Sequence, residues 1–289
     1  MENIIKSNPE QSGKIQWVTL GAVAIFHILA VAALFTFSWQ NLLAFIILWW
    51  VAGSLGIGMA YHRLLTHGGY KTPKWLEYFL TFCGTLALQS GALMWVTTHR
   101  IHHAHTETEN DPHSPRSGTY WAHIGWIFRG TAQNQDEETV RRYAPDLLKD
   151  KFHVVLSKYY YVPTIVLAVV LFAIGGFSMV LWGVFLRIVW GWHSTWLVNS
   201  ATHLWGTRRF ETHDDSRNNG LIAAVSFGEG WHNNHHANPR SAKHGMAWYE
   251  FDLNWLQISL LEKIGLAKKV YVYNYEKQEA KAETLQEAV

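Results

Sequence analysis

The sequence predicts an all-α integral membrane protein in which four transmembrane helices form two hairpins and carry a cytoplasmic helical cap. Hydrophobic residues make up 49% of the 289 residues and charged residues only 16%, whereas charged residues average about 25% in soluble domains. The apolar residues also gather in long runs, separated by polar stretches rich in histidine. Composition and segregation together predict the membrane fold.

Four apolar runs have the length of about 20 residues that is needed to cross a hydrocarbon core about 30 Å thick. They cover residues 15–37, 41–61, 159–178 and 179–200. The connections at 38–40 and 175–177 are short and contain no Lys or Arg. We therefore expect two helical hairpins within a membrane domain that spans 15–273. Residues 1–14 form a polar N-terminal segment and 274–289 a flexible charged tail.

Charge predicts the orientation of these spans. Residues 62–158 hold 11 Lys and Arg, and the chain after His203 holds 10, and such residues favour the cytoplasmic side. Both termini and both polar regions should therefore be cytoplasmic. A fifth apolar run, 75–96, should not span, because that would separate the histidines on its two sides. We expect an interfacial or re-entrant helix pair, broken near Gly84 or Gly91.

Composition also excludes several classes of function. The single cysteine, Cys83, rules out an intrachain disulfide and a thiolate zinc cluster. The net charge of +2 gives no indication of nucleic-acid binding. The polar start of the chain does not resemble a cleavable signal peptide, because the apolar run after it is too long.

Nine of the 17 histidines lie in clusters that should emerge on one face of the membrane. They are His62, His67, His99, His102, His103, His203, His232, His235 and His236. The triplets 99/102/103 and 232/235/236 have i, i+3, i+4 spacing, which places their imidazoles on one face of a helix. His62 and His67 are five residues apart and need a local distortion of the helix, or two different metals, to serve one site.

The number of clustered histidines predicts two metal ions, so the cap should carry a di-metal site. A tetrahedral zinc site takes four ligands, whereas nine imidazoles suit two ions with five or six ligands each. Imidazole binds Zn, Cu, Fe and Ni, so the ligand set alone does not identify the metal. His105 and His113 flank the second cluster and are candidates to orient its ligands, as are the carboxylates Asp111 and Glu229.

The histidine motifs resemble those of the membrane fatty acid desaturases, in particular the Δ9 stearoyl-CoA desaturase branch and its bacterial acyl-lipid relatives. The three boxes are His62-x4-His67, His99-x2-His102-His103 and His232-x2-His235-His236. The longer strings at residues 107–113, 196–203 and 228–236 also resemble those of this family. The resemblance implies that the nine histidines bind two Fe²⁺ ions and that Asn199 holds one of them through water. It also implies a bent acyl tunnel, with Gln89 and Thr195 at the kink and Trp95 and Trp196 as its walls.

The same resemblance implies an O₂-dependent desaturase that forms a cis double bond at Δ9 of a saturated acyl chain. In the animal enzymes an Arg-Asp pair before the second box contacts CoA, whereas this chain has Thr97 and Thr98. This departure favours an acyl-lipid over an acyl-CoA substrate. The implied partners are membrane lipid and an external electron donor, such as ferredoxin or a cytochrome b5-type protein, and do not include nucleic acid.

Two other functions remain open from the residues. A membrane di-iron hydroxylase would share the oxidant and insert oxygen. A histidine-rich metal transporter would place ligands at mid-membrane along a path, often with carboxylates. Arg187 lies inside the fourth span, where an arginine is costly, and is therefore a further functional candidate that could pair with a carboxylate or a lipid phosphate.

Overall fold

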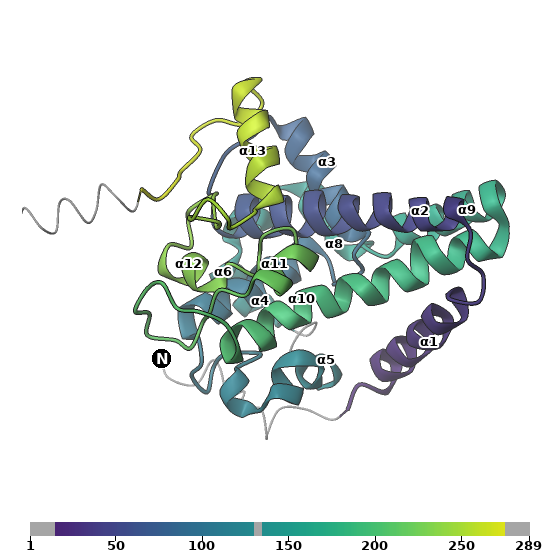
Figure 1. Ribbon diagram of the computed structural model, residues 1–289, viewed down its shortest axis with the longest axis horizontal. Helices are drawn as coiled ribbons and strands as arrows, with labels where there is room; N and C mark the ends of the chain where they lie inside the picture. Colours follow the sequence, from purple (N-terminus) through teal and green to yellow (C-terminus); the bar gives the residue numbers. More distant parts are fainter. Residues whose placement is uncertain (1–14, 130–134, 275–289) are drawn as a thin grey trace, which may run out of the picture.

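The computed structural model describes residues 15–129 and 135–274, and its regular elements in those ranges are helical. Residues 1–14 and 275–289, predicted as a polar segment and a charged tail, lie outside the described residues. The long helices α2, α9 and α10 run alongside one another, and most short helices gather at one end of them (Figure 1). The first helices are α1 (Trp17–Ala33), α2 (Trp39–Trp49), η1 (Trp50–Thr66), α3 (Lys74–Thr85) and α4 (Ala92–His105).

The middle of the chain contains short helices that lead into the second long pair. They are η2 (Pro115–Ser117), η3 (Trp121–Gly125), α5 (Trp126–Phe128), α6 (Glu137–Tyr143), α7 (Pro145–Leu148) and α8 (Lys151–Lys158). The remaining elements are α9 (Val162–Val180), η4 (Leu181–Leu186), α10 (Arg187–Leu204), α11 (Gly220–Val225), α12 (His232–Ala237) and α13 (Leu253–Lys263).

In the part of the chain that the structure describes, two helical runs are long and apolar enough to cross a membrane, Trp39–Thr66 and Val162–Leu204. The second run is interrupted at Gly175 and Gly176, where Gly176 has φ 67° and ψ −165°. This left-handed conformation suits glycine, and the chain reverses there, inside the range of α9, before it continues through η4 into α10 (Figure 1). The predicted hairpin turn at 175–177 is therefore present. Helix α1 is apolar but has 17 residues, fewer than the predicted 15–37.

The helix that begins at Trp39 continues past the predicted end of the second span at residue 61. From Trp50 to Thr66 it is π-helical, with hydrogen bonds from residue i to i+5. Gly56 of this segment packs on α3 so closely that a Cβ would lie 2.5 Å from the Gly84 Cα. The absence of side chains at these two glycines lets η1 and α3 pack backbone to backbone.

The fifth apolar run forms a broken helix pair, as predicted. Helix α3 ends at Thr85 and α4 begins at Ala92, with Gly91 as its N-terminal flanking residue. The intervening loop, residues 86–91, contains two non-glycine residues with positive φ, Leu88 at 53° and Ser90 at 70°. Gly84 lies inside α3 rather than at the break, because its place is set by packing on η1.

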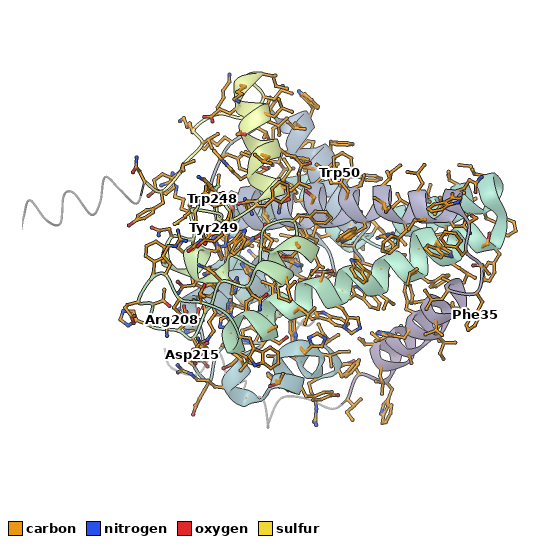
Figure 2. All side chains as sticks on the ribbon, in the orientation of Figure 1. Phe35, Trp50, Arg208, Asp215, Trp248 and Tyr249 are labelled. Atoms are coloured by element: carbon orange, nitrogen blue, oxygen red, sulfur yellow. The ribbon has the colours of Figure 1, made fainter. Side chains whose placement is uncertain are left out.

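Large apolar side chains face outward over much of the molecule. Phe35 is 86% exposed at the far end of the long helices, and Trp248 is 96% exposed at the end where the short helices gather (Figure 2). Helices α3 and α13 lie across the direction of the long helices (Figure 1). Helix α13 is fixed to η1 by hydrogen bonds from Trp50 to Gln257 (2.8 Å) and from Ser54 to Asn254 (2.6 Å). Exposed apolar area of this kind is typical of association with a membrane.

Candidate metal centre

The nine predicted histidines lie together in two adjacent groups. In each group, one ring nitrogen from every member lies within 4.8 Å of the corresponding atoms of the others. The five-histidine group contains His62, His67, His99, His103 and His235. The four-histidine group contains His102, His203, His232 and His236.

Each histidine triplet contributes to both groups, instead of aiming at a single point. In α4, His99 and His103 belong to the five-histidine group and His102 to the other. In α12 the division is reversed, because His235 joins the five-histidine group while His232 and His236 join the other. The i, i+4 pair of each helix thus serves one group and the intermediate residue serves the second.

His62 and His67 reach the same group because the helix that carries them is π-helical. The backbone N–H of His67 donates to the carbonyl of His62 at 3.2 Å, an i to i+5 hydrogen bond. This bonding brings residues five apart onto one face, and the two ring centroids are 4.9 Å apart. Of the two alternatives that the sequence left open, the structure has the local distortion.

Four carboxylates hold imidazoles of the two groups by their Nδ1 atoms. Glu229 accepts from His62 at 2.5 Å and Asp111 from His102 at 3.0 Å. A donated Nδ1–H fixes the tautomer and leaves a lone pair on Nε2, which faces the group. Asp111 and Glu229 were both predicted from the sequence to orient the ligands.

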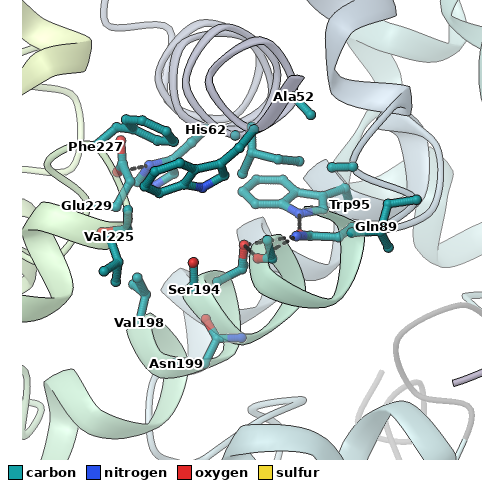
Figure 3. Close-up of a pocket in the computed structure, with 18 of the residues that line it drawn as sticks. Ala52, His62, Gln89, Trp95, Ser194, Val198, Asn199, Val225, Phe227 and Glu229 are labelled. Carbon is teal, nitrogen blue, oxygen red and sulfur yellow. Dashed lines mark hydrogen bonds and ion pairs between the residues drawn. The ribbon is translucent and has the colours of Figure 1, made fainter. Parts of the chain in front are cut away.

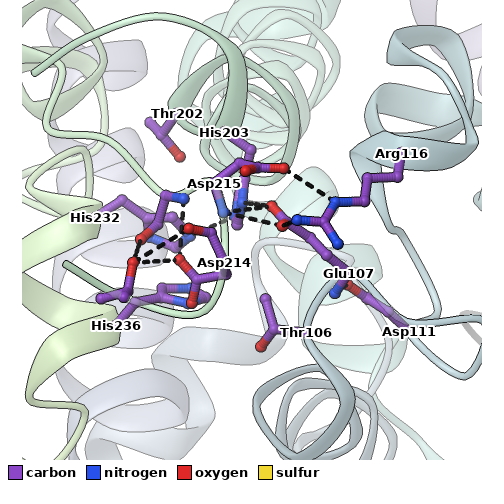
Figure 4. Close-up of polar contacts among 12 residues, drawn as sticks. Thr106, Glu107, Asp111, Arg116, Thr202, His203, Asp214, Asp215, His232 and His236 are labelled. Carbon is purple, nitrogen blue, oxygen red and sulfur yellow. Dashed lines mark hydrogen bonds and ion pairs between the residues drawn. The ribbon is translucent and has the colours of Figure 1, made fainter. Parts of the chain in front are cut away.

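The two other carboxylates were not predicted. Glu107 accepts from His203 Nδ1 at 2.8 Å, and Asp214 accepts from His236 Nδ1 at 2.8 Å (Figure 4). Glu107 lies in the matched string 107–113, but its backbone has φ 60°. A turn therefore sets the direction of its side chain, and helical spacing does not predict it. Asp214 lies in an irregular segment between α10 and α11, where spacing gives no indication of side-chain direction.

The two predicted flanking histidines differ from each other. His113 lies against the four-histidine group, with its ring centroid 4.3 Å from that of His102 and its Nδ1 3.8 Å from Asp111. His105 contacts the hydroxyl of Tyr143 at 3.1 Å instead of a ligand or a carboxylate of the site. A further histidine that spacing did not indicate, His244, lies 3.2 Å from Glu229.

Burial keeps six of the nine clustered imidazoles neutral. It lowers the pKa of five of them well below the ordinary value, and the neighbouring imidazoles lower it further. These are His67, His99, His103, His232 and His235. Burial also lowers the pKa of His236 to about 4. Although burial by itself raises the pKa of Glu229, the charge of Arg63 holds it well below the usual range.

The arrangement of ring nitrogens fits bound cations. The Nε2 of His62 carries a lone pair yet lies 3.1 Å from His235 Nε2. The Nε2 of His203 likewise lies 3.1 Å from His232 Nε2. Within the two histidine groups, four buried ring nitrogens have no hydrogen-bond partner: His67 Nε2, His232 Nδ1, His235 Nδ1 and His236 Nε2. Converging lone pairs on neutral imidazoles are what a transition-metal ion requires.

Two cavities meet beside the histidine groups. The η1 cavity, about 710 Å³, lies between η1 and α10, and the α1 cavity, about 1150 Å³, lies between α1, α5 and α10. Both are bounded by Gln89, Trp95, His99, Thr195 and Asn199. Of the predicted tunnel residues, three therefore lie where the cavities meet, and Trp196 lines the α1 cavity. Asn199 lies one helical turn before His203.

The junction of the cavities is fixed by hydrogen bonds among the predicted tunnel residues. Gln89 donates to the hydroxyl of Thr195 at 2.9 Å and accepts from the indole of Trp95 at 3.3 Å (Figure 3). The Trp95 ring stacks on His99 with centroids 4.9 Å apart. An apolar chain that ran from one cavity to the other would therefore pass directly beside the five-histidine group.

Comparison with known proteins agrees with this geometry. The sequence model of one family, described as "Fatty acid desaturase", matches residues 37–260. An sn-1 stearoyl-lipid 9-desaturase of Anabaena variabilis is 47% identical over 259 residues, which cover 89% of this chain and 94% of the relative. An sn-2 palmitoyl-lipid 9-desaturase of Nostoc sp. (strain 36) is 46% identical over 90% of this chain and 91% of the relative. An icosanoyl-CoA 5-desaturase of Limnanthes douglasii is 43% identical over 90% and 74%.

Proposed function

The chain belongs to the fatty acid desaturase family, and from this premise we propose that it forms a cis double bond at carbon 9 of a saturated acyl chain held by a membrane lipid. The broader activity, oxidative desaturation of a fatty acyl chain, follows from the family. The observation that carries the proposal is the contact between the five-histidine group and the junction of two largely apolar cavities.

The nine histidines would hold two iron ions, and Asn199 would hold one of them through water. The iron would supply the O₂-dependent oxidant that breaks unactivated C–H bonds, which no side-chain acid or base can do. The net reaction takes two hydrogens from the acyl chain, two electrons and two protons, and reduces O₂ to two waters. The carboxylates Glu229, Asp111, Glu107 and Asp214 orient the imidazoles for this task.

The cavities select the carbon pair that reacts. An acyl chain that occupies both must bend at Gln89 and Thr195, so one pair of methylenes lies beside His99. The apolar walls exclude water from the reacting carbons. Fixed geometry of this kind accelerates one reaction and suppresses its neighbours, because misplacement by about 1 Å can cost on the order of 100-fold in rate.

The mouth of the α1 cavity supports a lipid-borne substrate. The described residues that line this cavity include no Lys or Arg to pair with the phosphates of CoA. Thr97 and Thr98, at the positions where the animal enzymes contact CoA, are buried. Val18 of α1 lines the mouth and is 87% exposed, as suits a side chain that contacts lipid.

The placement in the membrane is part of the same proposal. The two hairpins would cross the bilayer four times, with the termini and the histidine groups on the cytoplasmic side. An external donor, a ferredoxin or a cytochrome b5-type protein, would supply electrons there. A polar cavity bounded by His103, His236 and Asp214 supports this, because it brings imidazoles of both groups close to the surface.

The test is expression of the chain in a host that lacks its own desaturase but supplies an electron donor. We expect new monounsaturated chains in the membrane lipids, with the double bond at carbon 9 by mass spectrometry. Hydroxylated chains without alkene would favour a hydroxylase instead. Saturated lipids throughout, with the protein and donor both present, would contradict the proposed function.

A further inference from the structure

The 86–91 loop between α3 and α4 forms the corner where the two cavities meet. Ala87 lines the η1 cavity, Leu88 and Ser90 line the α1 cavity, and Gln89 lines both. Successive residues of one short loop thus face the two arms of the proposed tunnel. The position of this loop relative to the histidines determines where a bound chain bends.

The loop backbone is strained and must be held by its surroundings. Leu88 and Ser90 have φ 53° and 70°, in a region that residues with a Cβ rarely adopt. Such conformations persist only where neighbouring structure fixes them, and they concentrate at functional sites. The carbonyls of this loop are therefore expected to have dedicated donors.

Helix α10 provides those donors. The Arg187 Nη1 donates to the carbonyl of Leu86, and the indole of Trp192 donates to the carbonyl of Leu88 at 3.2 Å. Arg187 is anchored in turn by a hydrogen bond from Nε to the carbonyl of Gly183 at 3.0 Å. Two side chains of α10, the helix that carries His203, thereby hold two carbonyls of the loop.

Arg187 also lines the η1 cavity, but among the described residues its guanidinium forms hydrogen bonds to the carbonyls of Leu86 and Gly183, and its Nη2 has no partner. The side chain is 1% exposed, so it does not reach a lipid phosphate. No carboxylate of the described residues forms an ion pair with it, although the sequence suggested one. A buried arginine in an apolar helix is costly, and its presence calls for a specific role. The hydrogen bond from Arg187 to Leu86 indicates that this role is to hold the 86–91 loop.

We propose that Arg187, together with Trp192, is a positioning residue that sets which carbon pair of the acyl chain is desaturated. It fixes the loop that carries Gln89, and hence the bend, at a set distance along α10 from His203. A shift of the bend by about 1 Å is comparable with one methylene of the substrate and would present a neighbouring pair. The inference rests on the proposed desaturase activity.

The experiment measures the position of the double bond in host lipids that accumulate with each variant. The variants are Arg187→Met, Arg187→Lys and Trp192→Phe. The matched control is Trp182→Phe, which removes a 2.8 Å hydrogen bond from the same helical run to the carbonyl of Ala33, away from the loop. Protein amount and iron content are measured in parallel, so that loss of folded enzyme is separated from a change in product.

We expect the wild-type chain and Trp182→Phe to give one dominant position, whatever their yields. Arg187→Met should move at least about 10% of the product to adjacent positions, with a smaller change in Trp192→Phe and partial rescue in Arg187→Lys. If Arg187→Met does not accumulate, Trp192→Phe decides the question. An unchanged position in an active Trp192→Phe and in any active Arg187 variant would overturn the inference. A wild-type chain without product would overturn the proposed function itself.

Discussion

The two histidine groups are built from the same helices but differ in what supports their imidazoles. Among the described members of the five-histidine group, His62 alone has a carboxylate on its Nδ1, namely Glu229. In the four-histidine group, three of the four imidazoles are held in this way. These pairs are His102–Asp111, His203–Glu107 and His236–Asp214.

The difference indicates two ways of building a site for a divalent ion from neutral ligands. The five-histidine group relies on number, since five nitrogens converge with little negative charge nearby. The four-histidine group relies on ligand strength, because a carboxylate on Nδ1 makes the opposite nitrogen a better donor. It also places three negative charges around the ion. We therefore expect the four-histidine group to bind its ion more tightly but to tolerate the loss of a ligand less well.

The largest expected effect is the loss of one ligand from the smaller group. His203→Ala leaves three imidazoles and also removes the partner of Glu107, so one ion should be lost and activity should fall by more than about 100-fold. His67→Ala leaves four imidazoles in its group and should cost about 10-fold. Iron per chain and product yield measure both variants. Equal losses in the two would remove the proposed difference between the groups.

Removal of a carboxylate gives the next largest effect and sharpens the comparison. Glu229→Gln removes the one carboxylate behind the five-histidine group and should weaken metal binding by about 10- to 100-fold. Asp214→Asn leaves two of three carboxylates in the other group, so its effect should lie near the lower end of that range. Iron titration of the metal-free protein would compare them. If Asp214→Asn lost more metal affinity than Glu229→Gln, the expectation that the five-histidine group is the weaker metal site would be wrong.

Acid should destabilise the metal-free protein through both groups. The unfolded chain takes up protons on its histidines near pH 6.5, whereas burial keeps six of these imidazoles neutral in the fold. The unfolded state then binds more protons, so stability is complete above pH 6.5 and falls below it. Each such histidine costs up to about 1.4 kcal/mol per pH unit. The melting temperature should fall between pH 7.5 and 5.5, less so with iron bound.

The smallest effect is expected for His105, which belongs to neither group. His105→Ala breaks a contact with the Tyr143 hydroxyl and leaves every imidazole of both groups in place. Stability should change by less than about 0.5 kcal/mol, and iron content should remain at the wild-type level. Loss of iron from this variant would show that His105 supports metal binding although it belongs to neither group.

The parts of the fold that the sequence predicts well are those set by local chemistry. The turn at Gly175 and Gly176 follows from the lack of charge and the two glycines between apolar runs. The break between α3 and α4 follows from the requirement that histidines on both sides share one site. The sequence also predicts which histidines lie together, because helical spacing places the members of each triplet on one face.

The remainder depends on packing that spacing does not encode. The π-helical form of η1 is supported by its close packing on α3, and from sequence it was one of two solutions for His62 and His67. The division of each triplet between the groups depends on how α4 and α12 face each other. Glu107 and Asp214 were missed because turns and irregular backbone direct them. Carboxylates in such segments are common, and their sequence positions do not distinguish the ones that support a ligand.

The mouth of the α1 cavity has a consequence for kinetics. Val18 lines the α1 cavity and is exposed on the outer face of α1. A lipid-borne acyl chain would therefore enter the cavity from the bilayer, by lateral diffusion within one leaflet. The relevant measure of substrate is then its mole fraction in the bilayer and not its amount per volume of buffer. Diluting the saturated lipid with an inert one should slow the reaction at constant total substrate, whereas diluting the whole suspension of vesicles should not.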